Sequence, residues 1–585
     1  MKYLLITLGH GSSAIYIDDD KKTVIGYEQE RLSGIKSDSQ FPKDAINEII
    51  NNVGYSEMKG CYVYISHWFN HQYSSADMLY NKYMQKIDVM NLKELSCGNI
   101  VQVNKLFSHH DAHAYSALSF LCYNAPEYTE ETYTIIADGF GNNEEVLSIY
   151  KSEAHDTLNP KLVLRVSDYR ASLGLMYQYA TSFCGMKENQ DEYKFLGYES
   201  HIDEVLSLEM IDTLDFYVED NVKALESFVH KEMLKKPEDR TVCKECNPDI
   251  AINTRALGDV RMHWYAVFKE LIDATGIDKN DAFKVRCVVA YFIQQSIEIF
   301  FMRLIKEFNM ENICLAGGCF YNVKLNNKIL NSITGKLCIM PLAGDQGAAI
   351  GMYTAFSGNV FNFGNLCFGK RRLYGIEKYE RDNIKVVSIK APSVIHSIAK
   401  DICDGNIVNI VRENMEFGPR ALCSTSSLFL PTTENVARNN LMNRRNEVMP
   451  CAPVILSENV QHMFNFKEFS RVIGSSKYMI CTFNYTKPYS KQYGGVMHKK
   501  PLENVYTGRP QVIESEYYAG NENDFMLRLL TTIEYICDAK CLVNTSFNAH
   551  GRPIVFDTMD IIHNFNFQCE HSPRDKQPIL YIIKD

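Results

Sequence analysis

The chain has 585 residues, of which 46% are hydrophobic and 23% are charged, a balance typical of packed globular domains and not of disordered segments. This length is enough for two or three domains of ordinary size. The net charge of −10 at pH 7 argues against a protein that binds nucleic acid over its whole surface, because phosphate neutralisation requires clustered Lys and Arg.

The first 30 residues predict three short strands joined by tight turns. The apolar segments 3–7, 14–17 and 23–27 are separated by a glycine-rich turn at 9–13 and by an acidic turn, a pattern typical of a β-meander. Glycine and serine in the first turn suit a loop whose backbone amides face an anion. His10 stands in this turn, where an imidazole can act as a general base toward a hydroxyl or remain a structural group.

The cysteines and the apolar segments indicate a protein with reduced thiols. The apolar start of the chain is too short for a secretory signal, so we expect the 18 cysteines to be thiols in a cytoplasmic protein. Cys243 and Cys246 form an isolated CxxC pair, which does not make a zinc site without a second pair at matching spacing. The predicted helix 283–308 is very apolar, but its uncharged stretch is shorter than the about 20 residues that span a bilayer. We expect a buried core helix and no membrane contact.

Histidines at the start of a predicted alanine-rich helix indicate a metal site. His109 and His113 are four residues apart, so both can point from one helical face toward one ion. Asp138 follows a predicted strand and Asp345 opens a predicted helix, and each can add a carboxylate. Imidazole with carboxylate suits Fe, Zn, Ni or Mn. An HExxH metalloprotease is a weaker interpretation, because His110 stands where that motif has glutamate.

A second α/β section repeats the features of the first. A predicted strand at 313–316 runs into Gly317 and Gly318, and a turn at 344–347 opens another helix. Glycine lets backbone amides approach phosphate oxygens closely. Two glycine-turned strand sections around helical insertions predict a duplicated, actin-like nucleotide-binding fold.

The C-terminal part carries a group of arginines near rigid turns. Residues 356–385 lack steady periodicity and are interpreted as a linker, whereas 386–585 alternate strands and helices like a separate α/β domain. Arg420 follows a Gly-Pro turn. A guanidinium binds phosphate through two parallel hydrogen bonds, so arginines of this part could converge on a small anion or simply be solvated. The arginines of this part are Arg420, Arg438, Arg444, Arg445, Arg509 and Arg552.

Taken together, several strings resemble the nodulation-type O-carbamoyltransferase family, which includes the carbamoyltransferases acting on tobramycin and cephamycin. The resemblance spans nearly the whole chain, and its most specific strings are MEFGPRAL and NTSFN. The matching segments are LGHGSSA (8–14), EQER (28–31), IKSD (35–38), FP (41–42), SHHDAHA (108–114), DG (138–139), NQDEYKFLG (189–197), LAGG (315–318) with Asn322, DQG (345–347), MEFGPRAL (415–422), AP (452–453), RPQ (509–511) and NTSFN (544–548).

The resemblance implies an α/β architecture in two parts. An actin-like (ASKHA) duplicated domain over 1–355 would carry the metal and a nucleotide, and after the linker 356–385 a YrdC-like α/β domain would occupy 386–585. By resemblance, the YrdC-like domain makes carbamoyl adenylate from carbamoyl phosphate and ATP with Mg²⁺. The N-terminal domain then transfers the carbamoyl group to an acceptor hydroxyl, so the chain is expected to be an enzyme.

The resemblance also assigns roles to individual residues. It implies a divalent metal, with Fe²⁺ expected, on His109, His113, Asp138 and Asp345, and catalytic roles for His10, Lys36 and Arg420. The residues expected to bind nucleotide or carbamoyl phosphate are Gly317, Gly318, Asn322, Arg420, Arg445, Arg509, Asn548 and Arg552. The chain departs from the family where Cys423-Ser424-Thr425-Ser426 replaces G-N-R-S and where residues 448–453 read VMPCAP for FRPFAP.

The acceptor is not defined by these residues. A small molecule such as an antibiotic, sugar or nucleotide is favoured over a polymer by the negative net charge. The alternatives are 5-hydroxymethylcytosine as a nucleotide or in DNA, a non-catalytic nucleotide-binding module, and a metal-dependent hydrolase. Insertions around 71–95 and 200–260 are predicted to shape the acceptor pocket, and a homodimer is the oligomer considered.

Overall fold

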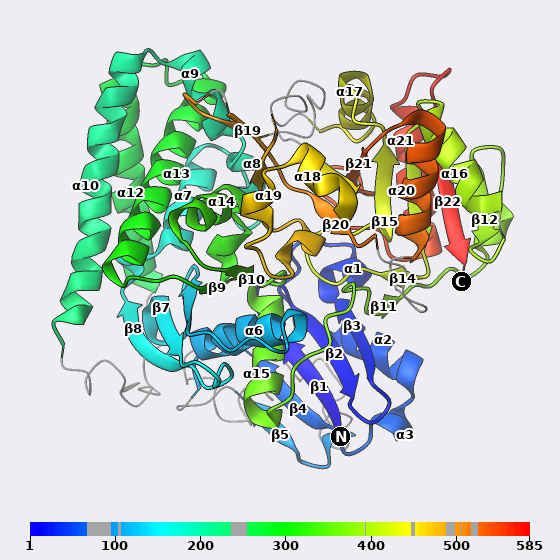
Figure 1. Cartoon of the computed structure of the whole chain (residues 1–585), viewed down its shortest axis with the longest axis horizontal. Coiled ribbons are helices and arrows are strands. Elements are labelled where there is room, and N and C mark those ends of the chain that lie inside the picture. Colours follow the sequence, from blue (N-terminus) through cyan, green and yellow to red (C-terminus); the bar gives the residue numbers. More distant parts are fainter. Residues whose placement is uncertain are drawn as a thin grey trace.

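The computed structural model describes residues 1–66, 95–102, 107–235, 254–391, 393–445, 451–486, 498–503, 505–515 and 524–584. The CxxC pair Cys243 and Cys246 and nearly all of the insertion 71–95 lie outside these residues. Figure 1 shows the N-terminal strands at the bottom, a group of long helices at the left, and the C-terminal sheet at the upper right.

The N-terminal sheet begins with the predicted meander. Its order is β3-β2-β1-β4-β5, in which β1 pairs antiparallel with β2, β2 pairs antiparallel with β3, and β1, β4 and β5 are parallel. Both faces are covered, so the central strand β1 is apolar almost throughout. The strands are β1 (Lys2–Thr7), β2 (Ser13–Asp18), β3 (Thr23–Glu28), β4 (Tyr62–Ser66) and β5 (Ile100–Gln102).

A second sheet repeats this topology strand for strand. Its order β8-β7-β6-β9-β10 has the same antiparallel meander followed by two parallel strands. The matching order and directions show two copies of one unit, as the duplicated sequence pattern predicts. The strands are β6 (Thr132–Ala137), β7 (Glu145–Ser152), β8 (Lys161–Ser167), β9 (Ile313–Ala316) and β10 (Leu337–Ile339).

Each unit ends in a helix that follows its last strand, and the two helices pack together. They are α6 (His109–Asn124) after β5 and α15 (Ala348–Ser357) after β10. At Gly351 a Cβ would stand only 1.7 Å from the carbonyl oxygen of Ala112, so glycine is required for this close approach. The contact places the N-terminal ends of both helices near one another.

A helical insertion separates β8 from β9 and forms the upright bundle at the left of Figure 1. Helix α13 is long and apolar enough to span a membrane, but 78% of its most apolar 18-residue stretch is buried inside the protein. It is therefore a core helix, as the sequence predicts. The insertion contains α7 (Leu173–Phe183), α8 (Glu192–Phe195), α9 (Ile202–Val205), α10 (Leu208–Met233), α12 (Thr254–Thr275) and α13 (Ala282–Glu307), and α14 (Val323–Ser332) follows β9.

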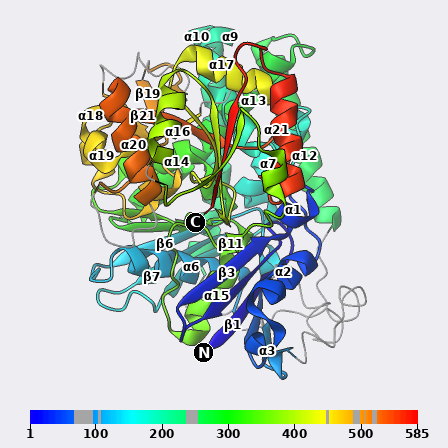
Figure 2. The ribbon, with the colours of Figure 1, turned by 90° about the vertical axis from the view of Figure 1, so that its right-hand side faces the viewer.

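The C-terminal part is built on a mixed seven-stranded sheet of order β12-β22-β13-β15-β21-β16-β20. Alternate residues of β22 point to opposite faces, so Tyr581 packs toward α16 (Ser393–Cys403) and α20 (Asp524–Cys537) and Ile582 toward α21 (Thr558–Glu570). Figure 2 shows these helices on the two sides of the sheet. The strands are β12 (Ile384–Ser388), β13 (Val408–Arg412), β15 (Thr425–Phe429), β16 (Ala452–Leu456), β20 (Gln511–Ile513), β21 (Cys541–Ser546) and β22 (Ile579–Lys584).

Shorter elements complete the molecule. In the N-terminal part α1 (Gln29–Ser33), α2 (Lys43–Val53) and α3 (Tyr55–Met58) follow the meander. The C-terminal helices are α16 (Ser393–Cys403), α17 (Thr433–Met442), α18 (Val460–Met463), α19 (Phe466–Phe469), α20 (Asp524–Cys537) and α21 (Thr558–Glu570). The remaining strands are β11 (Gly369–Lys370), β14 (Asn414–Met415), β17 (Phe483–Asn484), β18 (His498–Lys500) and β19 (Val505–Gly508).

The segment 356–385, interpreted from the sequence as a linker, is packed between the two parts. Phe361 and Phe363 are buried in the N-terminal core, and Lys370 accepts a hydrogen bond from the Tyr27 hydroxyl through its carbonyl. On the other side, β11 pairs with β14 of the C-terminal part, and the buried Arg371 donates to the Val555 carbonyl. The segment therefore fixes one part against the other.

Candidate functional site

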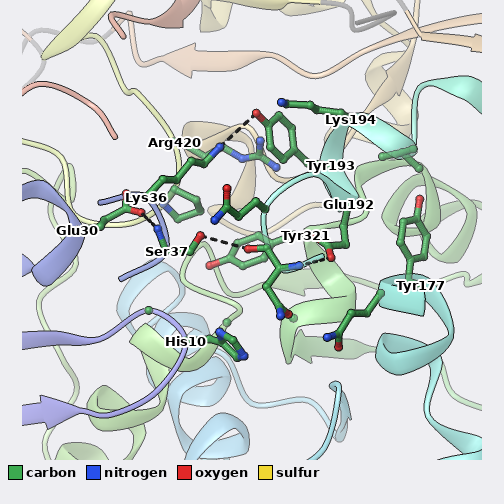
Figure 3. Close-up of a pocket in the computed structure, with 18 of the residues that line it drawn as sticks. His10, Glu30, Lys36, Ser37, Tyr177, Glu192, Tyr193, Lys194, Tyr321 and Arg420 are labelled. Atoms are coloured by element: carbon green, nitrogen blue, oxygen red, sulfur yellow. Dashed lines mark hydrogen bonds between the residues drawn. The ribbon is translucent and has the colours of Figure 1, made fainter. Parts of the chain in front are cut away.

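A cavity of about 970 Å³ lies between the N-terminal and C-terminal parts. The turn after β1, the segment that follows α1, and helices α7, α8 and α12 contribute from the N-terminal side, and the loops around Arg420, Arg509 and Asn548 from the other. Figure 3 shows His10, Lys36, Tyr177, Glu192 and Arg420 around it. The volume is large enough for a nucleotide and a small molecule.

The metal-ligating group begins with the first turn of α6. Ser108 caps this helix: its Oγ accepts from the Asp111 amide at 3.1 Å, and the Asp111 carboxylate accepts from the Ser108 amide at 2.7 Å. This capping box fixes where the helix starts. His109 and His113 therefore project from one face toward the end of β6.

The four predicted metal ligands meet at one point. The Nε2 atoms of His109 and His113 lie 3.1 Å apart, and His109 Nε2 lies 3.3 Å from a carboxylate oxygen of both Asp138 and Asp345. All four donor atoms are within 4.8 Å of one another. Both histidines are almost fully buried, while the two aspartates line the cavity.

The electrostatics of this group fit a cation. Burial lowers the pKa of His109, but the carboxylates of Asp345 and Asp138 outweigh burial and raise it to about 10. Burial raises the pKa of Asp138, but its hydrogen bonds to His109 and His113 bring it well below its ordinary value. Two ionised carboxylates facing two imidazole Nε2 atoms form a donor set that suits a divalent transition metal. The donor set present thus fits the predicted metal.

On the C-terminal side of the cavity, Arg420 and Arg509 form a positive centre. Burial lowers the pKa of Arg420, and burial together with the neighbouring Arg420 lowers the pKa of Arg509 well below its ordinary value. Among the described residues, neither guanidinium forms an ion pair with a carboxylate, and neither Nε has a hydrogen-bond partner. Two half-buried guanidinium groups that face one cavity, without a carboxylate partner among the described residues, suit an anion there.

Arg445 reaches the same cavity on a rigid support. Its guanidinium donates to Thr545 Oγ1 at 2.6 Å, to the Ser546 carbonyl at 3.1 Å and to Asn548 Oδ1 at 3.3 Å. Asn548 in turn donates to the Arg552 carbonyl at 2.6 Å. The NTSFN string therefore holds Arg445 and shapes the turn that carries Arg552.

The structure brings most predicted site residues together. The predicted site residues that line the cavity are His10, Lys36, Asp138, Gly318, Asn322, Asp345, Arg420, Arg445, Arg509, Asn548 and Arg552. The Asn322 side chain also caps α14 by accepting from the Leu325 amide at 3.0 Å. Gly317 does not line the cavity. Its role is in packing: its φ is 100°, and a Cβ at this position would stand 2.2 Å from the Ala137 carbonyl oxygen, so glycine is required.

Two arginines considered in the sequence point elsewhere. Arg438 donates to the Gly405 carbonyl at 2.9 Å, and Arg444 lies over the ring of Phe567 at 5.9 Å. Neither lines the cavity. These two arginines, which the resemblance does not assign to the site, are therefore not part of the group at the cavity.

Side chains of the helical insertion form the wall nearest to Lys36. The Lys36 ammonium lies 3.5 Å from the Tyr193 hydroxyl and 5.0 Å above its ring (Figure 3). Burial raises the pKa of the neighbouring Glu192 to about 7. From α12, Leu257 and Arg261 reach the cavity, so part of the predicted insertion 200–260 does line it.

Sequence reasoning missed residues that support the site. Glu416 is fully buried and accepts hydrogen bonds from the amides of Leu422, Ser424 and Thr425, which shapes the loop that follows Arg420. Its place in the MEFGPRAL string was the available signal. The buried Tyr321 hydroxyl has no hydrogen-bond partner among the described residues and lies at the cavity, and no string pointed to it.

Comparison with known proteins identifies the class of this site as that of a transferase. Residues 3–354 match the profile described as carbamoyltransferase N-terminus, and residues 399–570 match carbamoyltransferase C-terminus. The chain belongs to the carbamoyltransferase family, which confirms the resemblance drawn from the sequence.

Similar proteins include members of archaeal and bacterial origin. An uncharacterized protein of Methanocaldococcus jannaschii is 26% identical over 577 residues, covering 95% of both chains. Nodulation protein NolNO of Sinorhizobium fredii is 22% identical over 590 residues, covering 96% of this chain and 77% of that protein. Among solved structures, component A of the (R)-2-hydroxyglutaryl-CoA dehydratase of Acidaminococcus fermentans is 11% identical, with a TM-score of 0.30, and covers 61% of this chain and 98% of that chain.

Proposed function

We propose that the protein is an ATP-dependent O-carbamoyltransferase that takes its carbamoyl group from carbamoyl phosphate and passes it, as carbamoyl adenylate, to a hydroxyl of a small molecule. The observation that carries this proposal is the shared cavity. It joins the His/Asp metal-ligating group to Arg420 and Arg509, which have no carboxylate partner among the described residues. A site for a phosphate-bearing donor therefore faces a site suited to transfer.

The donor would be activated on the arginine side, in a C-terminal domain that we propose to be YrdC-like. Water cleaves carbamoyl phosphate to carbamate and inorganic phosphate. A carbamate oxygen then attacks the α-phosphorus of ATP, accompanied by Mg²⁺, and pyrophosphate leaves. Arg420, Arg445 and Arg509 would bind the phosphoryl oxygens and balance their charge, because a guanidinium matches phosphate geometry with two hydrogen bonds.

Transfer would take place where His10 and Lys36 face the cavity. The oxygen of the acceptor hydroxyl forms a bond to the carbamoyl carbon, and the bond from that carbon to the adenylate oxygen breaks, so AMP leaves with the electron pair. His10 would accept the hydroxyl proton as general base. Lys36 would hold a phosphate oxygen of the intermediate or a polar group of the acceptor.

The metal ligands have a defined part in this scheme. His109, His113, Asp138 and Asp345 would hold a divalent ion, for which we propose Fe²⁺, and the bound ion would supply positive charge that stabilises the charge developing during transfer. Gly318 and Asn322 line the neighbouring wall. Enclosing both steps in one cavity would protect the adenylate from water.

We propose a small-molecule acceptor, with 5-hydroxymethylcytosine as the alternative. The cavity volume of about 970 Å³ is in the range of sites for small ligands. The helical insertion contributes Tyr177, Glu192 and Leu257 to the lining of the cavity. These side chains offer ring, carboxyl and apolar contacts to an acceptor of this size.

The proposal is tested by incubating the protein with ATP, Mg²⁺, Fe²⁺ and carbamoyl phosphate, with and without a panel of hydroxylated compounds. AMP and pyrophosphate release should depend on carbamoyl phosphate, and one acceptor should gain about 43 mass units, as expected for addition of one carbamoyl group by nucleophilic transfer. Nucleotide binding without AMP release under every condition would indicate a binding module instead.

A further inference from the structure

We propose that Arg31 is a positioning residue that couples the anion-binding Arg420 to the loop carrying Lys36. The inference rests on the proposed function only for its kinetic consequence, because the coupling itself is a property of the fold. Arg31 lies in α1, is 3% exposed and contacts residues on both sides of the cavity.

On the donor side, Arg31 and Glu28 bind both backbone groups of Gly418. The Arg31 guanidinium donates to the Gly418 carbonyl at 2.7 Å, and Glu28 Oε2 accepts from the Gly418 amide at 3.0 Å. Arg31 and Glu28 pair with each other at 3.0 Å. These bonds join segments nearly 400 residues apart and fix the glycine directly before Pro419 and Arg420.

The backbone at Gly418 has little freedom to adjust. Its φ of 100° is in the left-handed region, and a Cβ at this position would stand 2.4 Å from Leu342 Cδ2. Pro419 then fixes the next φ angle. Arg420 therefore takes its direction from a turn whose first residue is held by Arg31 and Glu28.

On the acceptor side, the same guanidinium reaches the Lys36 loop through Glu30. Arg31 lies 3.2 Å from Glu30 Oε1, and Glu30 Oε2 accepts from the Ser37 amide at 2.8 Å (Figure 3). Ser37 has a φ of 56° and donates through its hydroxyl to the Asn189 carbonyl at 3.2 Å. The residue before it, Lys36, contacts Tyr193. One buried guanidinium thus orients cationic side chains on both sides of the cavity.

The chemistry of arginine explains why this position needs a planar fork. Its donors serve Glu28, Glu30 and the Gly418 carbonyl at once in fixed directions. A lysine keeps the charge, and so avoids leaving buried carboxylates without a cation, but its single ammonium cannot reach all three groups. Arg31→Lys therefore keeps the positive charge but removes the hydrogen bonds that position Gly418 and Glu30, so any effect of this variant reports on positioning.

The coupling is tested by amide hydrogen exchange of short segments. In Arg31→Lys, the amides of Gly418 and Ser37 should both exchange at least tenfold faster, whereas the Leu422 amide, held by Glu416 at 2.8 Å, should stay protected. Glu28→Gln should affect only the Gly418 segment and Glu30→Gln only the Ser37 segment. Arg303→Lys on α13, which changes a partly exposed arginine paired with Glu219, is the matched control.

The kinetic consequence is measured separately. Arg31→Lys should raise the KM for carbamoyl phosphate about tenfold in wild type but less than twofold in an Arg420→Lys background, because Arg31 acts through Arg420. Any of three results would overturn the coupling. The KM could rise equally in both backgrounds, amide exchange in Arg31→Lys could change in only one of the two segments, or the Leu422 amide could also exchange faster. If the wild-type protein releases no AMP, the proposed function fails while the exchange result still decides the coupling.

Discussion

His109 and Asp345 lie at the starts of corresponding helical segments in the two duplicated units, and their side chains meet at 3.3 Å. His109 is the first residue of the helix after β5, and Asp345 is the first residue of the 3-10 turn Asp345–Gly347 that leads into the helix after β10. Because α6 and α15 pack together at Gly351, duplication of the unit brings both helix starts to one point. The metal-ligating group is therefore a product of the fold's internal repeat, completed by Asp138 at the end of β6.

The first prediction concerns the metal. His109→Ala combined with His113→Ala should reduce the bound divalent metal to less than about a tenth of the wild-type content, because two of the four donors are lost. Elemental analysis of the purified protein measures this directly. His230→Ala, which changes a surface histidine paired with Glu307, should keep the full metal content. Full metal in the double variant would refute the site.

The second prediction concerns the charge of Arg509. This half-buried guanidinium stands beside Arg420, and burial lowers its pKa, so Arg509→Met should remove a desolvation cost and raise the thermal midpoint by a few degrees. It should also abolish AMP release, since the anion loses a ligand. In thermal melts, millimolar phosphate should stabilise the wild-type protein and leave Arg509→Met unchanged. A lower midpoint for the variant would show that Arg509 is structurally required.

Much of the N-terminal fold could be predicted because its signals are local. The meander alternates apolar segments with glycine and acidic turns, and α13 is apolar over many turns. The segment 356–385 could not be predicted in this way. Phe361 and Phe363 insert into the N-terminal core without any regular period, and β11 has only two residues, so no local pattern reveals that the segment is packed.

The candidate site was predictable where sequence spacing sets geometry. His109 and His113 share a face because they are four residues apart, whatever the rest of the chain does. For adjacent residues beyond the end of a helix, sequence spacing does not set the direction of the side chains. Arg444 and Arg445 follow α17, and because Arg444 has a φ of 50°, one guanidinium stacks on a ring while the other enters the cavity. Likewise, nothing in the sequence indicates that Arg31 bonds to Gly418.

The third prediction concerns pH and Glu192. Burial raises the pKa of this carboxyl to about 7 in the folded protein, above its ordinary value near 4.5. The folded state then binds more protons than the unfolded state between these two values, so this group makes stability fall as the pH rises from about 4.5 to 7. Glu192→Gln should therefore be more stable than the wild-type protein at pH 8 and equal to it at pH 4.5. Thermal melts across this range measure the difference, and a constant difference would contradict the assignment.

The last prediction separates the two proposed half-reactions through His10. His10→Gln should lower carbamoyl transfer to the acceptor by about 10²- to 10⁴-fold, the usual contribution of a general base. Pyrophosphate release from ATP and carbamoyl phosphate should change less than twofold, because that step is assigned to Arg420, Arg445 and Arg509 across the cavity. The exposed imidazole of His10 makes a loss of stability on substitution small, and His230→Gln serves as the matched surface control. If both half-reactions fell together, His10 would belong to donor activation, and the hydroxyl proton would have to leave through another group on the wall formed by Lys36 and Glu192.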